Sequence, residues 1–459
     1  QIQRGVGTST NGAGAFGATV NVETNTPVTE AFAEINNSYG SFNTRKHNVI
    51  FNTGILKSQW AFEGRLSNIA SDGYIDRASS DLKSYYLSGA FYGKKSMIKM
   101  LAFGGQEKTY QSWWGTPEAR INNDVDGMNT VVANNYLSSA DSLNLLTSGR
   151  TYNYYTYDNE VDHYQQDHYQ LHFSQELGAQ FNLTTALHYT YGRGYYEQFK
   201  ASEDLSDYNI NYIPVGAVDT IKSSDIIRRR WLDNHFAGII FSLDYTSDQV
   251  NSTIGGGYNY YDGDHFGEVI WAQFAGSSSI RDRYYDNVGE KGDFNVYWKT
   301  NFQVNQKLNL FADLQLRNVS YKTYGIDNDQ RPIDINTTFT FFNPKAGITY
   351  QINPASTVYG SFALANREPV RNDFIDATSP PEHETLMDIE IGYKLLKDRY
   401  QVKANLYNMS YENQLVLTGE LNDVGSAIRT NVDRSYRRGI ELEAGYELLK
   451  GLQWSVNAT

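Results

Sequence analysis

Hydrophobic and polar residues alternate along most of the chain from about residue 30 onward. In residues 307–317, leucines and an alanine fill every second position, and Asn309, Asp313, Gln315 and Arg317 lie between them. Successive side chains of a β-strand point to opposite faces, so this repeat of two residues predicts strands with one apolar and one polar face. The same repeat occurs in residues 167–174, 182–191, 294–304 and 401–408. The pattern predicts an all-β chain.

Strand length and connection length favour a membrane barrel over a soluble sandwich. Many predicted strands span about 10–14 residues, enough for a tilted strand to cross a bilayer and longer than the usual globular strand. Their connections alternate between tight turns and long polar stretches, which is the layout of a transmembrane antiparallel β-barrel. The turns are at 93–95, 178–180, 247–248, 305–306, 353–354 and 397–398, and the long stretches are 109–163, 195–230, 261–282, 321–340, 366–385 and 412–430. We count roughly 16–17 strands, fewer than the ~22 of a plugged barrel, so the barrel is expected to be incomplete.

Composition agrees with this prediction. The 459 residues include 36 Tyr and 22 Phe but only 9 Pro. Aromatic residues favour strands, and pairs such as Tyr195-Tyr196 and Tyr284-Tyr285 lie where predicted strands meet loops, as in the aromatic girdle of a membrane barrel. No apolar run approaches the ~18 residues of a transmembrane helix. A soluble all-β protein with ordinary aromatic residues is the alternative.

Charge and motif content argue against several other classes of protein. The chain has 39 basic and 52 acidic residues and a net charge of −13, which is unfavourable for binding nucleic acid phosphates. Without cysteine, neither disulfides nor thiolate metal sites can form. The sequence HETLM at 383–387 begins like the zinc-protease motif H-E-x-x-H, but Met387 occupies the place of the second histidine. We therefore expect no catalytic residues and no enzyme.

Gly12, Gly14 and Gly17 form the pattern G-x-G-x-x-G, which in dinucleotide-binding proteins joins a strand to a helix. Residues 18–24 alternate with a period of two and therefore predict a strand. Because no helix N-terminus follows the glycines, no phosphate site is expected.

Three stretches of the chain resemble TonB-dependent outer-membrane receptors. IQRGVGTSTNGAGAFGATVNVETNTP, near the N-terminus, resembles the end of that family's plug domain. NPKAGITYQINPASTVYGSFALANREPVRNDF, at 343–374, resembles a late barrel hairpin whose outer end reads like REPTRND. PEHETLMDIEIGYKL and the NVDRSYRRGIEL element at 431–442 resemble the strands that follow. The order and spacing of these stretches match the family along essentially the whole chain.

The resemblance implies a Gram-negative outer-membrane location and an architecture of two domains. Residues 1–26 would be the C-terminal end of the plug and residues 27–459 the barrel, with its closing strands missing. Gly12, Gly14 and Gly17 would let backbone pack closely against backbone inside the lumen. The polar face that contains Asn309, Asp313, Gln315 and Arg317 would hold the plug.

The resemblance also implies the function. Members of this family bind a scarce nutrient and import it with energy relayed by TonB, so a ferric siderophore or similar metal chelate is the expected ligand. Receptors for cobalamin, haem or glycans, and a passive porin, are the alternatives. Other expected partners are outer-membrane lipids, lipopolysaccharide and, as a further candidate, a surface lipoprotein. The resemblance implies no cofactor and no resident metal.

Two groups of residues are candidates for contact with the ligand. The loop GGQEKTYQSWWGTPEARI offers Trp113 and Trp114, flanked by Tyr110 and Arg120, as an exposed aromatic and cationic cluster. His168 and His172 are predicted on the lumenal face of one strand, about 13 Å apart and too distant for one metal ion between them. Packing onto the plug and ordinary polar lumen lining are the respective alternatives.

Acidic loops at Asp124 and Asp126 and at Asp327 and Asp329 supply oxygen atoms of the kind that Ca²⁺ prefers. Neither loop has the complete calcium-binding pattern, so solvated loops are the favoured interpretation.

Overall fold

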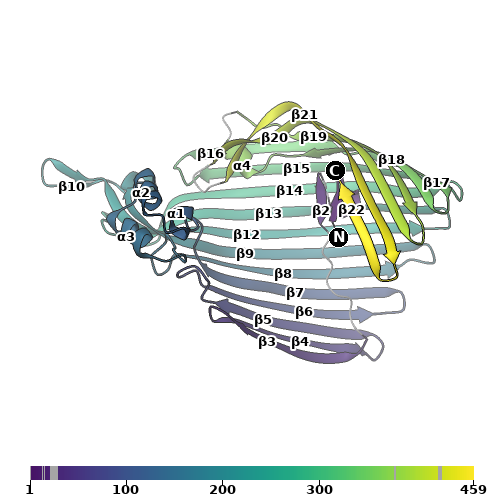
Figure 1. The fold of residues 1–459 in the computed structure, drawn as a ribbon, viewed down its shortest axis with the longest axis horizontal. Coiled ribbons are helices and arrows are strands. Elements are labelled where there is room, and N and C mark those ends of the chain that lie inside the picture. The colour runs from purple at the N-terminus through teal and green to yellow at the C-terminus, as the bar shows by residue number, and fades with distance from the viewer. Residues whose placement is uncertain (1, 13, 15, 21–28, 377–378, 422–425) are drawn as a thin grey trace.

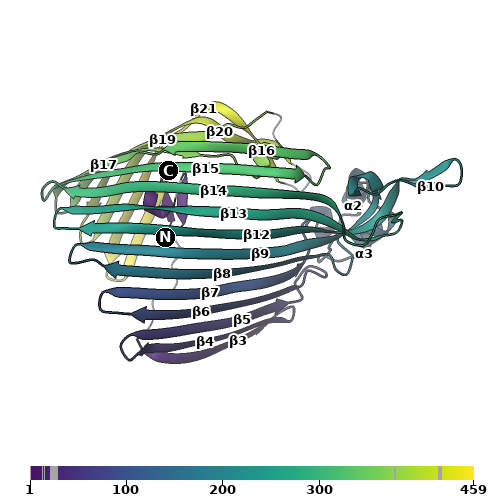
Figure 2. The same ribbon diagram turned by 180° about the vertical axis from the view of Figure 1, so that it is seen from behind.

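The computed structural model describes the whole chain except residues 1, 13, 15, 21–28, 377–378 and 422–425. Its main feature is one large, strongly curved antiparallel sheet (Figures 1 and 2). The strands of this sheet are β3 (Ala31–Gly40), β4 (Thr44–Leu56), β5 (Trp60–Ser71), β6 (Ser80–Tyr92), β7 (Ser96–Tyr110), β8 (Val161–Glu176), β9 (Phe181–Asp204), β12 (Ser223–Thr246), β13 (Val250–Ala272), β14 (Asp282–Gln303), β15 (Leu308–Ile326), β16 (Pro332–Phe342), β17 (Lys345–Asn353), β18 (Ser356–Arg367), β19 (Glu384–Leu396), β20 (Tyr400–Leu421), β21 (Ala427–Leu449) and β22 (Leu452–Ala458).

These eighteen strands of the described residues follow one another around a barrel wall. Because β16 and β17 both pair with β15, they share one position in the sheet, and the sheet agrees with the strand count predicted from the sequence. β22 and β3 are neighbours in the ring order. Within the described part of the chain, however, no residue register joins these two strands, and every residue of both is exposed. We therefore describe the wall as a barrel with an unsealed seam between β22 and β3.

Several strands are much longer than the sequence pattern predicted. β9 and β12 have 24 residues each, and β13 has 23. Only about ten residues of a tilted strand are needed to cross a bilayer. The polar stretch 195–230, expected as a loop, contains the ends of β9 and β12, which pair with each other from Ser223 to Tyr245. Polar side chains allow this because the strand ladder is made by backbone groups, which every residue except proline supplies in full.

The short turns are confirmed, but not every connection at the other end is long: β15 and β16 occupy most of 321–340 and leave only 327–331 between them. Residues 93–95, 178–180, 247–248, 305–306, 353–354 and 397–398 all lie at or beside tight turns between consecutive strands. The longest connection, 111–160, contains three helices that the sequence pattern did not predict: α1 (Glu118–Ile121), α2 (Val125–Asn134) and α3 (Ser139–Thr147). With the hairpin β10 (Ile213–Val215) and β11 (Asp219–Ile221), they project beyond one end of the barrel wall (Figures 1 and 2).

Local capping and a small core explain the helices of this loop. Asp124 accepts a hydrogen bond from the backbone of Gly127 at the start of α2, and Ser138 accepts one at the start of α3. Met128 and Leu145 from the two helices are buried together with Tyr152. No helix of the described residues is long and apolar enough to cross a membrane.

The two faces of β15 behave as the alternation predicted. Leu310, Leu314 and Leu316 are exposed on the outer face. Asp313 and Arg317 on the other face have exposed fractions of only 0% and 4%. Because only the second face carries paired polar groups, the outer face suits lipid and the inner face forms the lumen.

Candidate functional site

The N-terminal segment lies against the inner face of the barrel. A small sheet of β1 (Ile2–Arg4) and β2 (Ala18–Val20) flanks the short helix η1 (Ser9–Asn11). The backbone N–H of Ser9 donates to Asp313 Oδ2 at 2.8 Å, and its hydroxyl donates to Oδ1 at 2.5 Å. Lys345 Nζ lies 3.7 Å from the Asp313 carboxylate and donates to Ser9 Oγ at 3.1 Å. Of the four inner-face residues of β15 expected to hold this segment, Asp313 does so directly.

Apolar contacts hold the same segment further along. Phe16 is buried in a cluster with Ala365, Leu386 and Tyr411 from three strands of the wall. Its ring meets that of Tyr411 edge-on at 6.4 Å, and the Arg367 guanidinium lies 5.7 Å from the Phe16 ring centre. Buried polar contacts at Ser9 and aromatic packing at Phe16 thus attach the segment to the wall.

The three glycines have a different environment from the expected one. A Cβ placed on Gly12, Gly14 or Gly17 would meet no atom within 4 Å. The described residues of this chain therefore provide no close backbone approach there, although Gly12 adopts a φ of 110°, which favours glycine. The strand predicted over 18–24 is present at Ala18–Val20, and its remainder lies outside the described residues.

Trp113 and Trp114 are exposed, as the sequence suggested, with exposed fractions of 59% and 73%. The ring of Trp113 stands edge-on to Tyr196 at 5.6 Å, and the ring of Trp114 lies 6.1 Å from Tyr154. Tyr196 belongs to β9, so Trp113 lies beside the end of the barrel wall that carries the long loops.

Tyr110 and Arg120 do not join these tryptophans in an exposed cluster, which corrects the prediction for these two residues. Tyr110 is buried, and its hydroxyl donates to the Tyr157 carbonyl at 2.7 Å. Arg120 is also buried and donates to the carbonyls of Leu145 and Leu146 near the end of α3. The helical fold of the loop needs these bonds, because the last carbonyls of a helix have no partner within it.

His168 and His172 lie on β8 and make separate contacts. The His168 ring stacks on Phe103 at 4.6 Å, and its Nδ1 is 2.9 Å from Thr190 Oγ1. His172 Nε2 is 3.0 Å from Gln170 Oε1. Only His168 lines one of the cavities described next.

Two cavities lie along the wall formed by β8, β9, β12 and β13. The first, of about 540 Å³, is lined by His168, His188, Asn234 and Tyr261 among others. The second, of about 460 Å³, is lined by Tyr196, Arg230, His265 and Tyr285 among others. Tyr164 lines both cavities, so they are adjacent.

Strand pairing places these residues on the inner face. Tyr261 pairs with Lys291, which pairs with Tyr321, two strands away on β15. Tyr321 and Arg317 are four residues apart on β15 and therefore share the lumenal face. Polar and aromatic residues at every second position are the signal that could have identified these sites, but the same signal occurs on every strand.

The run Arg228-Arg229-Arg230 is divided between the two faces of β12. Arg229 donates to Glu197 at 2.8 Å, on the opposite face from Arg228 and Arg230. Arg228 donates to the Tyr208 hydroxyl at 3.0 Å, and Arg230 donates to the hydroxyls of Tyr196 and Tyr284 at 3.2 and 3.3 Å. Because side chains two residues apart on a strand share a face, Arg228 lies on the same face as Arg230, which lines the second cavity.

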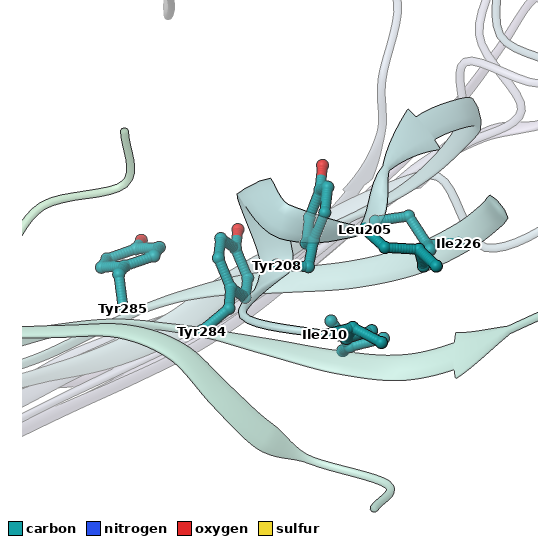
Figure 3. Packing of buried hydrophobic residues seen from close by; sticks show 7 residues of the cluster. Leu205, Tyr208, Ile210, Ile226, Tyr284 and Tyr285 are labelled. Carbon is teal, nitrogen blue, oxygen red and sulfur yellow. The ribbon is translucent and has the colours of Figure 1, made fainter. Parts of the chain in front are cut away.

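An apolar cluster fixes the tyrosines that contact these arginines. Its buried members are Leu205, Tyr208, Ile210, Ile226, Val269, Tyr284 and Tyr285. Figure 3 shows the rings of Tyr208, Tyr284 and Tyr285 next to one another, and the ring centres of Tyr208 and Tyr284 are 4.8 Å apart. Burial raises the pKa of Tyr208, so its hydroxyl stays neutral and serves as an acceptor for Arg228.

Two buried carboxyl groups of the loops have opposite electrostatic environments. Burial raises the pKa of Glu160 to about 7, although its Oε2 accepts a bond from the Phe199 backbone at 3.0 Å. Burial alone would also raise the pKa of Glu368, but Arg317 and Lys291 lower it below its ordinary value. Glu368 is therefore ionised at neutral pH, and Glu160 is not fully ionised.

In the acidic loop at Asp327, the carboxylates form ion pairs with Arg331 of the same loop. Arg331 Nε lies 2.7 Å from Asp327 Oδ2, and Arg331 Nη2 lies 3.0 Å from Asp329 Oδ2. These contacts favour the solvated-loop interpretation over a calcium site.

Solved structures with a similar fold include receptors and a transporter. The ferric-catecholate import receptor Fiu from E. coli K12 aligns with a TM-score of 0.63 at 15% identity, over 99% of this chain and 69% of that one. The copper transporter OprC aligns with a TM-score of 0.69 at 13% identity, over 98% and 64%. The ferripyoverdine receptor of the outer membrane of Pseudomonas aeruginosa aligns with a TM-score of 0.64 at 16% identity, over 98% and 58%.

The present chain thus spans roughly two thirds of the length of such receptors or less. A comparison with curated protein sequences gave no match. The family model for TonB-dependent receptor-like β-barrels matches residues 109–459, which is most of the chain. The sequence motifs, the barrel and this match agree, and the chain belongs to the family of TonB-dependent receptors.

Proposed function

We propose that this chain is part of an outer-membrane receptor of a Gram-negative bacterium that imports a ferric siderophore or a similar metal chelate. In this proposal, residues 1–26 are the end of a plug and residues 27–459 form the barrel. The observation that carries the proposal is the attachment of Ser9 to Asp313 and Lys345 inside the barrel. A segment anchored within the lumen supports a plugged transporter over a porin, whose barrel leaves an aqueous channel.

The proposed transport step follows from the strength of this attachment. Hydrogen bonds that water can replace contribute little net free energy, so a plug held by a few of them can move without unfolding the barrel. The outer membrane has no nucleotide supply or ion gradient of its own. We therefore propose that TonB, driven from the inner membrane, supplies the pull. Lipids and lipopolysaccharide would surround the exposed outer face.

Uptake is expected to depend on the energy state of the cell. In cells that carry the full-length receptor, collapse of the proton gradient should stop accumulation of a radioactive-iron chelate while binding at the cell surface persists. The measurement compares cell-associated and internalised iron with and without a protonophore. A strain that lacks the receptor gives the background. Accumulation that continues unchanged after the gradient collapses would identify a passive channel instead.

We further propose that Trp113 and Trp114 contact the ligand, together with the inner cavities that include His168. The proposal rests on their exposure and on the contact of Trp113 with Tyr196, a residue that also lines a cavity. Tyr110 and Arg120 would act indirectly, by holding the loop that carries the tryptophans. His172, which lies outside the cavities, remains a candidate of lower priority.

Replacement of both tryptophans by alanine should weaken binding of the chelate by more than about tenfold, if each ring contributes on the order of 1 kcal/mol. Equilibrium binding to outer-membrane vesicles that contain the full-length protein measures this effect. Replacement of exposed Tyr136, on the same loop but beyond α2, is the matched control and should leave the affinity unchanged. An unaltered affinity in the correctly inserted tryptophan variant would remove this loop from the binding site.

A further inference from the structure

Residues 368–376 form a segment that we call the inner strap, because it is fixed to the inner face at several points. It follows β18 and includes the short helix α4 (Arg371–Ile375). Glu368 accepts from Arg317 at 2.8 Å and from Lys291 at 2.6 Å. At the other end of the strap, Asp373 forms a two-bond pair with Arg429 of β21, with both distances 2.8 Å. The strap therefore connects β14 and β15 with β21.

Arg371 differs from the other charged residues of the strap. Glu368 and Asp373 have cationic partners, and Asp376 lies 3.9 Å from Arg331. Arg371 donates instead to two neutral groups, Thr323 Oγ1 at 2.7 Å and Asn287 Oδ1 at 2.6 Å. Within the described part of the chain, no carboxylate forms an ion pair with it. Its positive charge is thus held in place without being neutralised.

The surroundings of Arg371 hold its guanidinium in place. Thr323 and Asn287 are buried, with exposed fractions of 0% and 2%, whereas Arg371 itself is partly exposed. A Cβ on Gly289 would lie 3.7 Å from Arg371 Nη1, at ordinary van der Waals contact, so Gly289 lies directly beside the guanidinium. Phe374 stacks on Tyr321 at 5.4 Å and fixes the helix that carries Arg371.

The guanidinium also lies near both inner cavities. Its acceptor Asn287 pairs across the sheet with His265, which lines the second cavity, and Tyr261, which lines the first, is four residues from His265 on β13. A guanidinium presents a planar set of donors that match anionic oxygen atoms, and it stays charged at every physiological pH. An anion bound here would supply the counter-charge that the described residues do not.

We propose that Arg371 binds an anionic oxygen group of the transported chelate, a catecholate or a carboxylate, and makes the receptor selective for negatively charged chelates. This inference rests on the proposed function, which gives the receptor a chelate to transport. Arg317 and Arg429 cannot take this role because carboxylates of the strap already occupy them.

The test compares two hexadentate ferric complexes, a triply anionic tris-catecholate and a neutral tris-hydroxamate, with the full-length receptor in outer-membrane vesicles. Arg371→Gln should lower the affinity for the anionic complex by roughly tenfold to hundredfold, because a charged hydrogen-bonded contact is lost. Its affinity for the neutral complex should stay within about twofold of the wild-type value. Arg371→Lys keeps the charge without the planar fork and should have an intermediate affinity for the anionic complex.

Arg331→Gln is the matched control, because Arg331 lies on a neighbouring loop and its charge is already taken by Asp327. It should leave the affinities for both complexes unchanged. If Arg371→Gln binds the anionic complex like the wild type, or loses both complexes equally, the proposal is overturned. If Arg371→Gln fails to insert into the membrane, Arg371→Lys serves as the test. Wild-type affinity of Arg371→Lys for the anionic complex would then overturn the proposed planar contact.

A second measurement separates this inference from the proposed function. Citrate without iron should raise the thermal unfolding temperature of the wild type but not that of Arg371→Gln. If neither ferric complex binds the wild type, ferric-chelate import is wrong. The anion site is supported even in that case if citrate raises the unfolding temperature of the wild type alone. Equal shifts for the wild type and Arg371→Gln overturn the anion site.

Discussion

Arg317→Met is expected to destabilise the barrel by about 3–5 kcal/mol, because it leaves buried carboxylates without their main partner. Arg317 has an exposed fraction of 4% and donates to both Asp293, at 2.7 Å, and Glu368, at 2.8 Å. Lys291 would still neutralise part of the charge of Glu368. Among the described residues, Arg317 is the cation that pairs with Asp293, so Asp293 would lose its counter-charge. The large effect comes from the cost of an unpaired charge in a poorly solvated place.

Reversible urea unfolding of the full-length receptor in lipid vesicles measures this change in free energy. Arg283→Met is the matched control, because Arg283 also pairs with an aspartate at 2.7 Å, but both side chains are about half exposed. Water compensates an exposed pair, so the control should cost at most about 1 kcal/mol. The triple variant that also carries Asp293→Asn and Glu368→Gln should recover much of the loss. Equal costs for Arg317→Met and Arg283→Met would contradict the proposed importance of burial.

Asp313→Asn is expected to release the N-terminal segment from the wall. Asp313 is completely buried and is the acceptor for both the N–H and the hydroxyl of Ser9. Its replacement also leaves the buried Lys345 without its counter-charge. Loss of a buried charge partner costs about 3–5 kcal/mol, so opening of this contact should become roughly a hundredfold to several thousandfold more frequent.

Hydrogen exchange at the Ser9 amide of the full-length receptor measures that opening. Lys299→Met removes a different contact to the same segment, a solvent-exposed bond of 3.1 Å to Thr10, and should accelerate exchange by less than about tenfold. The double variant Asp313→Asn/Lys345→Met contains no unpaired charge and should exchange more slowly than Asp313→Asn alone. Exchange at the wild-type rate in Asp313→Asn would show that Asp313 does not hold the segment.

The sequence by itself determined the strands, their two faces and the ends of the barrel at which turns and loops lie. Alternation in residues 307–317 separated Leu310 and Leu314 from Asp313 and Arg317, and the structure keeps that separation. This was possible because the direction of a side chain from a strand is a local property with a period of two. The short turns were predictable for the same reason, since each depends on only a few consecutive residues.

Where a strand ends was not determined in this way. β9 and β12 continue through residues that the sequence presented as polar loop, because their backbones pair with each other over nearly their whole length. The helices of residues 111–160 were also missed. They are stabilised by a small core of their own, and Arg120 crosses that loop to reach Leu145, 25 residues away.

The partners of the inner-face residues were decided only by the tertiary structure. Every strand presents polar residues to the lumen, so the sequence could not show that Arg317 would meet Glu368, 51 residues away, or that Ser9 would meet Asp313, 304 residues away. It also could not show that Arg371 alone among the charges of the inner strap would be left with neutral partners. Such pairings depend on the curvature and register of the whole barrel, which sum over many strands, whereas alternation within one strand depends only on its neighbours in the chain.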